Sequence, residues 1–389
     1  MFRVQDGKIV LDGKRLDLRP YLTREPVILA LLSTVAVVLF AAVSELSSLY
    51  HTQQKSLGTR SYAGGAADLR QRHYAHAVNE FRTALLYSRD NYTYQLNLAE
   101  ALVGLHRTEE ASTYLINLWE RQPENGLVNL ELARIAAQKG NTEQALRYYH
   151  NAIYATWPGN QDLEMRQTRL ELIEYLLKIR ARVQAQSELI LLAANLENDP
   201  AQQAHVGDLF VQAQDYPDAL NAYSLCLRAD RGNREALAGA GRAAFELGRY
   251  PTAERYLQAA VNASSSDSES AALLKTTELV LEMDPFRRRI STATRNRMVI
   301  AAFAAAGERL KSCTASTSSA PLASEQSLPD RWARMKPQIN ERGLGRDPDL
   351  AEDAMELVFD IERQTSAACE APTGTDRALL LIGKLHEGI

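Results

Sequence analysis

The sequence predicts an all-α protein: a solenoid of paired helices that follows one N-terminal transmembrane helix and precedes a small helical C-terminal region. An uncharged apolar run spans residues 26–43, and alanines recur at a fixed interval through the middle of the chain. Pro and Gly are scarce while good helix formers abound. The 389 residues contain three cysteines and carry a net charge of −4. These values exclude a disulfide-built scaffold and disfavour a nucleic-acid binder.

The apolar run from Pro26 to Val43 has the length of one membrane crossing. It reads PVILALLSTVAVVLFAAV, and Ser44 extends it to Glu45. At about 1.5 Å per residue it covers roughly 27–30 Å, close to the thickness of a hydrocarbon core. A cleaved signal peptide is the alternative, but its apolar core is usually only about 7–15 residues long. We therefore expect a retained anchor in the inner membrane of a bacterium.

Positive charge is concentrated on the N-terminal side of this run. Residues 1–25 are rich in Lys and Arg, whereas only Lys55 and Arg60 occur in roughly the next fifteen residues. The positive-inside rule therefore places the N-terminus in the cytoplasm and the repeats in the periplasm or another extracytoplasmic space. The inverted topology, with the repeats facing the cytosol, is the alternative. The tail could form a hairpin around two Asp-Gly pairs, but a lone hairpin is marginal, which favours a loosely ordered tail.

A periodic set of alanines marks the repeat. The steps between them are 34, 34, 40, 34 and 34 residues, so one period carries six extra residues. We place the extra residues in a loop near Trp157 to Leu163, where the chain reads WPGNQD. A large apolar or aromatic residue follows each marker by four positions, and a residue for the seam between helices comes three further on. The markers are Ala77, Ala111, Ala145, Ala185, Ala219 and Ala253.

This pattern resembles the tetratricopeptide repeat (TPR), and QKGNTEQALRYYHNAI and ELGRYPTAERYLQAAV are similar to its consensus. A small residue stands eighth in five of the six units. The resemblance implies two antiparallel helices per unit, joined by a tight turn that Gly140 and Gly248 suit. Neighbouring units must stack, because one hairpin cannot bury its apolar face. The fourth unit departs from the pattern, with Ile173 and Arg182 at two of the marked positions.

The repeat register divides the chain into five segments. We expect a cytoplasmic tail (1–25), a transmembrane helix (26–44), a linker (45–57), six TPR-like repeats (58–264), and a helical capping and C-terminal region (265–389). The six repeats cover about 58–91, 92–125, 126–159, 166–199, 200–233 and 234–264.

The C-terminal region predicts a capping helix and four further helices. A Ser-led start and an amphipathic pattern indicate a first helix that ends before Pro285. A second helix is expected from about Ser291 to Lys311, and a shorter one around Trp332. A fourth helix is indicated by apolar residues at helical spacing, and the last runs from about Asp376 to His386. The apolar face consists of Ala354, Leu357, Val358 and Ile361.

Two of the three cysteines lie in this C-terminal region. In an oxidising compartment Cys313 and Cys369 could form a disulfide. The alternative, of equal weight, is that they are two unrelated thiols. Cys226 occupies the seam position of the fifth repeat and is expected to be a buried apolar residue.

Catalytic, metal and cofactor motifs are not found in the sequence. It contains no GxSxG, HExxH, Walker A or dinucleotide-binding pattern. His73 and His76 lie three residues apart but lack further ligands. We therefore predict no enzyme, no metal and no cofactor. An active site in the C-terminal region is an alternative without a candidate nucleophile, base or metal set.

The TPR resemblance also implies where a partner binds. In the family, the first helix of each hairpin lines a concave face, and the second, fifth, ninth, twelfth and thirteenth residues contact ligands. The Lys/Asn set that clamps a peptide carboxylate in some TPR domains is absent, so we expect an extended or helical protein segment. Self-association is left open, and some positions are expected to be core or solvent residues. The candidates are Tyr62, Leu69, Arg70, Thr93, Leu96, Glu100, Leu130, Arg134, Gln138, Asp208, Gln212, Arg242, Phe245 and Glu246.

Overall fold

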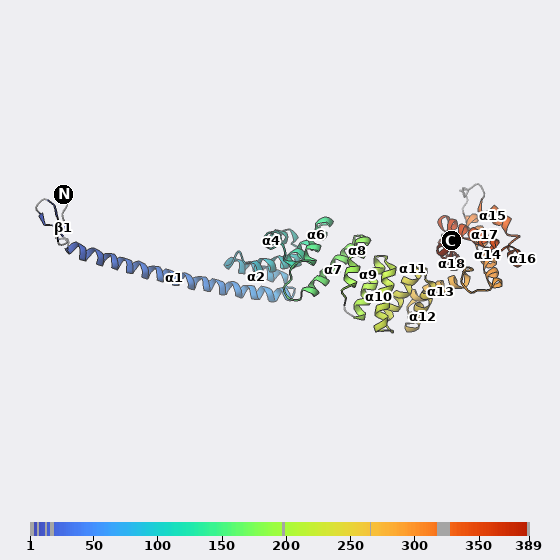
Figure 1. The fold of residues 1–389 in the computed structure, drawn as a ribbon, viewed down its shortest axis with the longest axis horizontal. Helices are drawn as coiled ribbons and strands as arrows, with labels where there is room; N and C mark the ends of the chain where they lie inside the picture. The colour runs from blue at the N-terminus through green and yellow to red at the C-terminus, as the bar shows by residue number, and fades with distance from the viewer. Residues whose placement is uncertain are drawn as a thin grey trace. The chain divides into compact units, whose positions relative to one another are not determined.

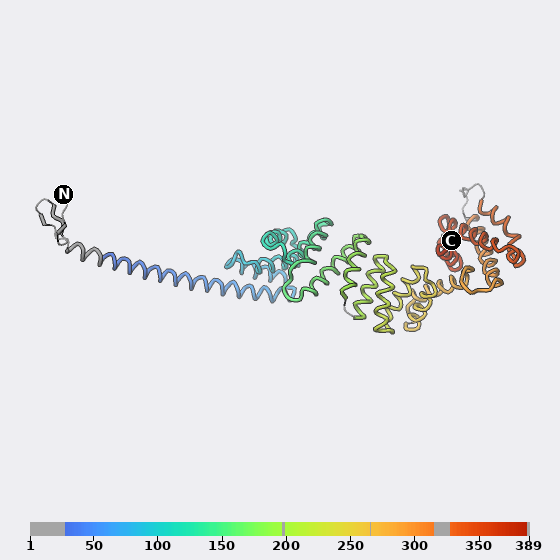
Figure 2. Tube along the Cα trace, viewed as in Figure 1, coloured from blue at the N-terminus to red at the C-terminus, as the bar shows by residue number. Residues whose placement is uncertain are grey.

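The computed structural model describes residues 4–5, 8–11, 14–15, 19–196, 199–264, 266–316 and 327–386. These residues divide into two compact units, Met1–Thr168 and Arg169–Ile389. Each unit has its own apolar core. Helices dominate both units (Figures 1 and 2), so the predicted all-α class is confirmed.

Three short strands begin the first unit. Strand β1 (Val4–Gln5) pairs antiparallel with β2 (Lys8–Leu11), which pairs antiparallel with β3 (Lys14–Arg15). The hairpin that the sequence left as the less favoured option is therefore present among the described residues of the tail.

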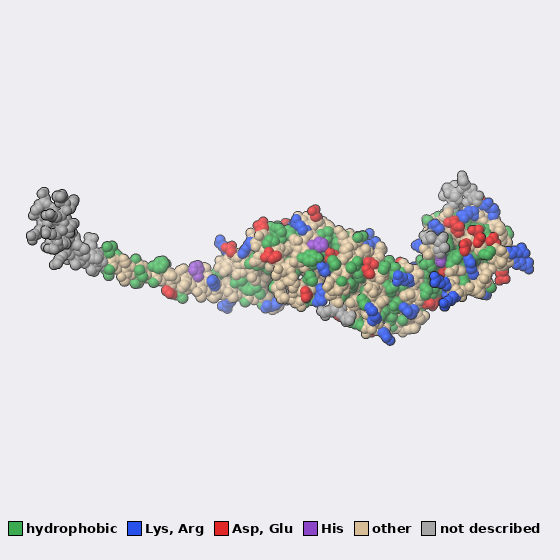
Figure 3. All heavy atoms as spheres, in the orientation of Figure 1, with side chains coloured by type: hydrophobic (Ala, Val, Ile, Leu, Met, Phe, Trp, Pro, Cys, Tyr) green, Lys and Arg blue, Asp and Glu red, His purple; other side chains and the backbone are tan. Residues whose placement is uncertain are grey.

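Helix α1 runs from Arg19 to Arg70 without a break. It includes the apolar run and also residues 45–57, so the segment expected to be a linker is helical. Among the described residues, it is the one helix long and apolar enough to cross a membrane. Large apolar side chains such as Phe40, 77% exposed, cover its surface (Figure 3).

Three helical hairpins complete the first unit. The end of α1 packs against α2 (Tyr74–Tyr87), α3 (Tyr92–Gly104) against α4 (Thr108–Arg121), and α5 (Gly126–Gln138) against α6 (Thr142–Ile153). Helices α3 and α5 begin at Asn91 and Asn125. Each asparagine side chain accepts a backbone hydrogen bond at 3.1 Å from the third residue after it, which stabilises the helix start.

The second unit continues the pattern after α7 (Gln161–Lys178), which contains the division between the units. Helix α8 (Arg182–Ala193) is followed by the hairpins α9 (Pro200–Gln212) with α10 (Tyr216–Ala229) and α11 (Arg234–Glu246) with α12 (Tyr250–Ala263). Helix α13 (Ser268–Met283) packs against α11 and α12.

The periodic residues of the sequence form the cores of the hairpins. All six marker alanines have no exposed surface, because a larger side chain would separate the paired helices. The large residue four positions after each marker is also buried. A Cβ atom at Gly65 would overlap the Phe81 ring, and one at Gly207 would overlap the Tyr223 ring. The small eighth residue therefore makes room for the large residue of the second helix.

The turns within the hairpins share one backbone conformation. The residue five positions before each marker has φ between 59° and 71°, in the left-handed region. Gly140 and Gly248 suit this conformation, as the sequence indicated. Four other turns place a non-glycine residue there, which costs about 1 kcal/mol each and needs the packing of the hairpin to hold it. Those residues are Arg72, His106, Arg180 and Gln214.

The extra residues of the longer period are shared between a loop and a helix. The chain between α6 and α7 includes Trp157, which is buried and donates from Nε1 to the carbonyl of Ala152 at 2.8 Å. Helix α7 has 18 residues where α5 and α9 have 13. The prediction of a loop alone was therefore incomplete, because part of the insertion lengthens α7.

Five more helices follow α13 in the second unit. They are α14 (Thr292–Ser316), α15 (Leu328–Met335), α16 (Glu341–Arg346), α17 (Asp349–Ala368) and α18 (Gly374–His386). The sequence indicated all of them except α16. The predicted apolar face of α17 is fully buried, and α18 packs against both α13 and α17.

Candidate functional site

In the first unit, polar candidates gather on the first helices of the hairpins. Tyr62 on α1 accepts a hydrogen bond from Nδ2 of Asn97 on α3 at 3.0 Å, and its ring stacks on Tyr94 at 4.7 Å between centroids. Glu100 follows one turn after Asn97. Burial raises the pKa of Glu100, and the nearby Arg134 guanidinium on α5 opposes the shift. The structure therefore brings Tyr62, Glu100 and Arg134 onto one set of adjacent helices.

Arg134 forms an ion pair with Glu131 on the same helix. Its Nη1 lies 2.6 Å from Oε1 of Glu131, whose side chain is nearly buried, whereas 41% of the Arg134 side chain is exposed. A buried carboxylate needs a partner, so Glu131 holds Arg134 in place. The remaining candidates with solvent exposure in this unit are Arg70, Thr93 and Gln138. Leu69 is half-buried and packs against the core.

In the second unit, three candidates line one cavity. Asp208 and Gln212 on α9 and Arg242 on α11 surround a cavity of about 310 Å³. Its apolar lining comes from Val211, Ala238, Gly239 and Leu273. Asp267, which caps α13, and Glu269 and Ser270 of α13 supply another side of the cavity. The remaining lining residues are Glu235 and Tyr223.

Tyr223 on helix α10 also lines this cavity. It is 1% exposed, and its hydroxyl donates to Oδ1 of Asp208 at 2.6 Å. Burial raises the pKa of the Tyr223 phenol far above its usual value, and the bond to Asp208 adds to the rise. The phenol therefore stays protonated and keeps Asp208 directed along the cavity wall.

The cavity carries more negative than positive charge. Arg242 forms an ion pair with Glu269, so the charge of its guanidinium is balanced by that carboxylate. Hydrogen bonds from Ser270 lower the pKa of Asp267, including one from its backbone N–H at 3.0 Å. Asp208 and Glu235 add further carboxylates. Such a lining favours a cationic group near apolar surface.

The α13 contribution was not foreseen from the sequence, which treated this helix as a cap. Ser268 comes 34 residues after Arg234, so α13 begins where the first helix of a seventh repeat would begin. Asp267 also caps it in the way that Asn233 caps α11. Continuing the 34-residue register by one period would have identified Glu269, the second residue of that unit.

Three candidates are core residues in this structure. Leu96, Leu130 and Phe245 are only 8%, 6% and 5% exposed. Phe245 packs edge-on against Tyr250 at 5.6 Å between ring centroids. Large apolar side chains at these positions bury themselves between hairpins, which leaves little surface for a ligand. Glu246, the next residue, is exposed and lies at a separate cavity of about 300 Å³ beside α18.

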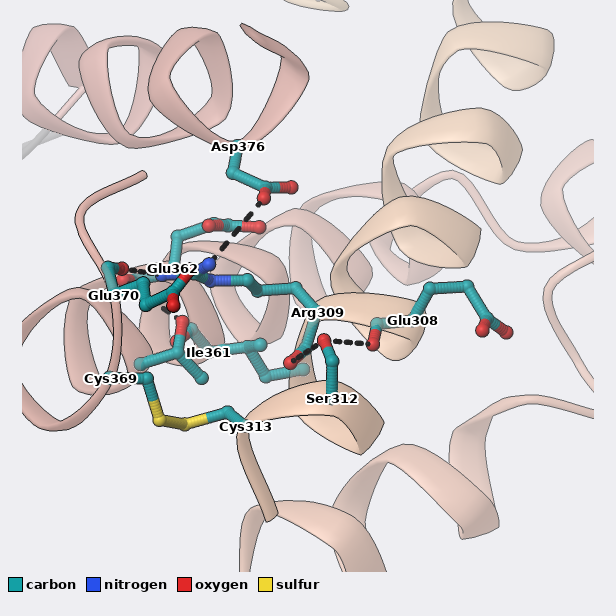
Figure 4. Close-up of polar contacts among 10 residues, drawn as sticks. Glu308, Arg309, Ser312, Cys313, Ile361, Glu362, Cys369, Glu370 and Asp376 are labelled. Atoms are coloured by element: carbon teal, nitrogen blue, oxygen red, sulfur yellow. Dashed lines mark hydrogen bonds and ion pairs between the residues drawn. A yellow bond between two sulfur atoms is a disulfide. The ribbon is translucent and has the colours of Figure 1, made fainter. Parts of the chain in front are cut away.

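The last pair of predicted site residues is joined covalently. Cys313 and Cys369 form a disulfide with their Cα atoms 5.8 Å apart. It links the end of α14 to the residue after α17 (Figure 4). Cys226 is a free, buried thiol at the seam of α10.

Comparison with known proteins identifies the repeats. Family models described as tetratricopeptide repeat match residues 96–161 and 210–276. The tetratricopeptide repeat protein 21 homolog of Caenorhabditis elegans is 22% identical over 197 residues, which are 50% of this chain and 14% of that protein.

Two solved structures are similar at low identity. The C-terminal part of a TPR repeat-containing protein from Cytophaga hutchinsonii is 11% identical with a TM-score of 0.43, over 79% of this chain and 99% of its own. YrrB, a TPR protein with an unusual peptide-binding site, is 16% identical with a TM-score of 0.39, over 49% and 95%. Combined with the buried marker residues and the hairpin turns, the two family matches show that the chain contains tetratricopeptide repeats.

Proposed function

We propose that this protein is a membrane-anchored scaffold whose TPR hairpins hold a segment of another protein against their first helices. The cavity between α9, α11 and α13 carries this proposal, because three residues predicted as ligand contacts line it together. TPR proteins typically act as interaction scaffolds and not as enzymes, which agrees with the lack of catalytic motifs in the sequence.

The lining of the cavity favours a basic side chain of the bound segment. The aliphatic stem of a Lys or Arg fits against Val211, Ala238 and Leu273, and its charged head reaches the carboxylates of Asp208 and Glu235. A cavity of about 310 Å³ accommodates one such side chain and its backbone. The first-helix surface of the first unit, with Glu100 and the Arg134–Glu131 pair, would contact a separate part of the partner.

Charge reversal on the first helices tests this binding mode. Arg134→Glu together with Arg242→Glu changes one exposed guanidinium in each unit, and we expect the bound partner to be lost or strongly reduced in a pull-down from native membranes. The matched control is Arg147→Glu with Arg255→Glu, on the second helices α6 and α12. Equal recovery with both pairs of variants would move the binding surface away from the first helices.

Part of any loss of binding could come from breaking the Arg242–Glu269 ion pair within the protein and not from losing a contact with the partner. The swap Arg242→Glu with Glu269→Arg restores opposite charges within the protein. If the swap binds as the unaltered chain does, Arg242 acts by orienting α13. If binding stays weak, the side chain at 242 contacts the partner directly.

We place the repeats outside the cytoplasm, anchored by the apolar part of α1. The support is the exposed apolar surface of this helix and the positive charge that precedes it. Protease added to intact spheroplasts should then digest the repeats and leave a short membrane-bound fragment. Protection of the repeats until the cells are lysed would instead indicate a cytosol-facing adaptor. Release of the intact chain from membranes by alkaline carbonate would contradict the anchor.

A further inference from the structure

Glu362 is a buried acid without a hydrogen-bond partner. It lies on α17 with no exposed surface, and neither of its carboxylate oxygens is bonded to any other group that the structure describes. An isolated carboxylate in such a place strongly favours its protonated form. This residue has no part in the cavity of the repeats, so its burial calls for a separate explanation.

Two charged side chains face Glu362 from neighbouring helices. Figure 4 shows it converging with Arg309 of α14 and Asp376 of α18. Arg309 Nη1 lies 3.9 Å from Asp376 Oδ2, and Arg309 Nη2 donates to the carbonyl of Glu370. Burial raises the pKa of Glu362 to about 8, Asp376 adds to the rise, and Arg309 opposes it. The neighbouring Glu308 pairs with Lys311 at the surface.

The disulfide lies at the same corner of the molecule. Cys313 lies in the last turn of α14, and Cys369 begins the connection from α17 to α18. The connection is thus tied to α14 twice, through the disulfide and through the bond from Arg309 to Glu370. It leads into α18, which packs against α17, the helix that carries Glu362, and against α13. His386 at the end of α18 contacts Asp284 at 3.2 Å.

We propose that the Cys313–Cys369 disulfide is a redox-controlled latch that keeps α18 closed over Glu362 and against α13, and that ionisation of Glu362 drives the opening once the disulfide is cleaved. A dithiol reductant cleaves the disulfide. Its thiolate attacks Sγ of Cys369, which is partly exposed, and Cys313 leaves as a thiolate that takes up a proton. The second thiol of the reductant then resolves the mixed disulfide. The reductant supplies two electrons, and two protein thiols remain.

The buried acid makes opening depend on pH after reduction. In the closed state Glu362 is neutral, and in the open state it is solvated and gives its proton to water. The ratio of open to closed protein should therefore rise about tenfold per pH unit between the ordinary carboxyl range and about pH 8. While the disulfide is intact, the connection cannot move away from α14 and this dependence is suppressed.

Hydrogen exchange of the full-length chain in detergent micelles tests the latch. Amides of residues 374–386 are compared with and without a dithiol at pH 6, 7 and 8, for the native chain and for Glu362→Gln. Glutamine mimics the neutral acid in size and charge. The ratio of exchange rates between the two chains cancels the chemical pH effect and any other influence that both chains share.

We expect this ratio to stay constant in the oxidised protein and to rise about tenfold per pH unit in the reduced protein, up to about pH 8. The pair Cys313→Ser with Cys369→Ser should behave like the reduced protein without any reductant. Asp376→Asn should lower the pH at which the rise ends, because one like charge is removed. Unchanged exchange of α18 on reduction would overturn the latch, and a flat ratio in the reduced chain would overturn the role of Glu362.

Discussion

The hydroxyl of Tyr223 donates to Asp208 across 2.6 Å and joins the two helices of the fifth hairpin where both residues line the cavity between α9, α11 and α13. The ring of Tyr223 fits here because Gly207 and Gly239 have no Cβ atom that would overlap it. A residue of the core thereby sets the direction of a residue of the proposed binding surface. This contact connects the repeat pattern with the proposed function.

Removing the hydroxyl should weaken both the hairpin and the cavity wall. We expect Tyr223→Phe to lower the free energy of unfolding by about 1–2 kcal/mol, because a charged acceptor loses its donor. Urea denaturation followed by circular dichroism measures this loss. Tyr256→Phe, on the half-buried surface of α12, is the matched control and should change stability by less than about 0.5 kcal/mol. Equal effects of the two substitutions would contradict the role of the hydroxyl.

Filling the space beside the ring should displace it. A Cβ atom at Gly239 would overlap Tyr223, so Gly239→Ala is expected to cost about 1–3 kcal/mol despite the better helix propensity of alanine. Urea denaturation followed by circular dichroism measures this change as well. Gly345→Ala in α16, where the new Cβ meets no neighbour, is the control and should be neutral or slightly stabilising. A stabilised Gly239→Ala protein would show that the ring has room to move.

Glu362 should make the stability of the second unit fall as pH rises. Its pKa in the folded protein is about 8, above the ordinary value of 4.5. The neutral acid is therefore favoured by folding, and stability is highest below pH 4.5 and decreases up to about pH 8. Glu362→Gln should match the native chain near pH 5 and exceed it by roughly 2–4 kcal/mol at pH 8. A native chain with the same pH profile as Glu362→Gln would contradict the buried-acid assignment.

The disulfide should stabilise the second unit through the chain it closes. Cys313 and Cys369 are 56 residues apart, and a closed loop of this length is worth about 4 kcal/mol in the chain-entropy estimate. Double substitution by serine should lower the unfolding free energy by about that amount under non-reducing conditions. A chain that shows no loss, or free thiols at both positions in the purified protein, would exclude the bond.

The repeat itself could be predicted because its signals are local and recur. Ala77 and its five counterparts are buried wherever two helices meet, so their spacing alone gives the register. The turns were visible only where Gly140 and Gly248 occur, since Arg72 and Gln214 adopt the same left-handed conformation without a sequence signal. The marker pattern thus predicts which residues pack between the helices, but it predicts the backbone conformation of the turns only in part.

Features that depend on distant parts of the chain were harder to predict. The composition of residues 45–57 gave no sign that α1 continues unbroken from the apolar run into the first hairpin. The role of α13 in the cavity follows from its stacking against α11, although its eighth residue, Lys275, departs from the small-residue rule. Likewise, Leu130 and Phe245 match family ligand positions but are buried by their neighbours.

The central claim, that the first helices hold the partner, is tested most directly by site-specific photocrosslinking in native membranes. A photoreactive residue replaces Gln212, which lines the cavity on α9, or Gln184, an exposed glutamine on the second helix α8. We predict a covalent adduct with one partner protein at position 212 and none at position 184. An adduct at position 184 together with none at position 212 would contradict the account.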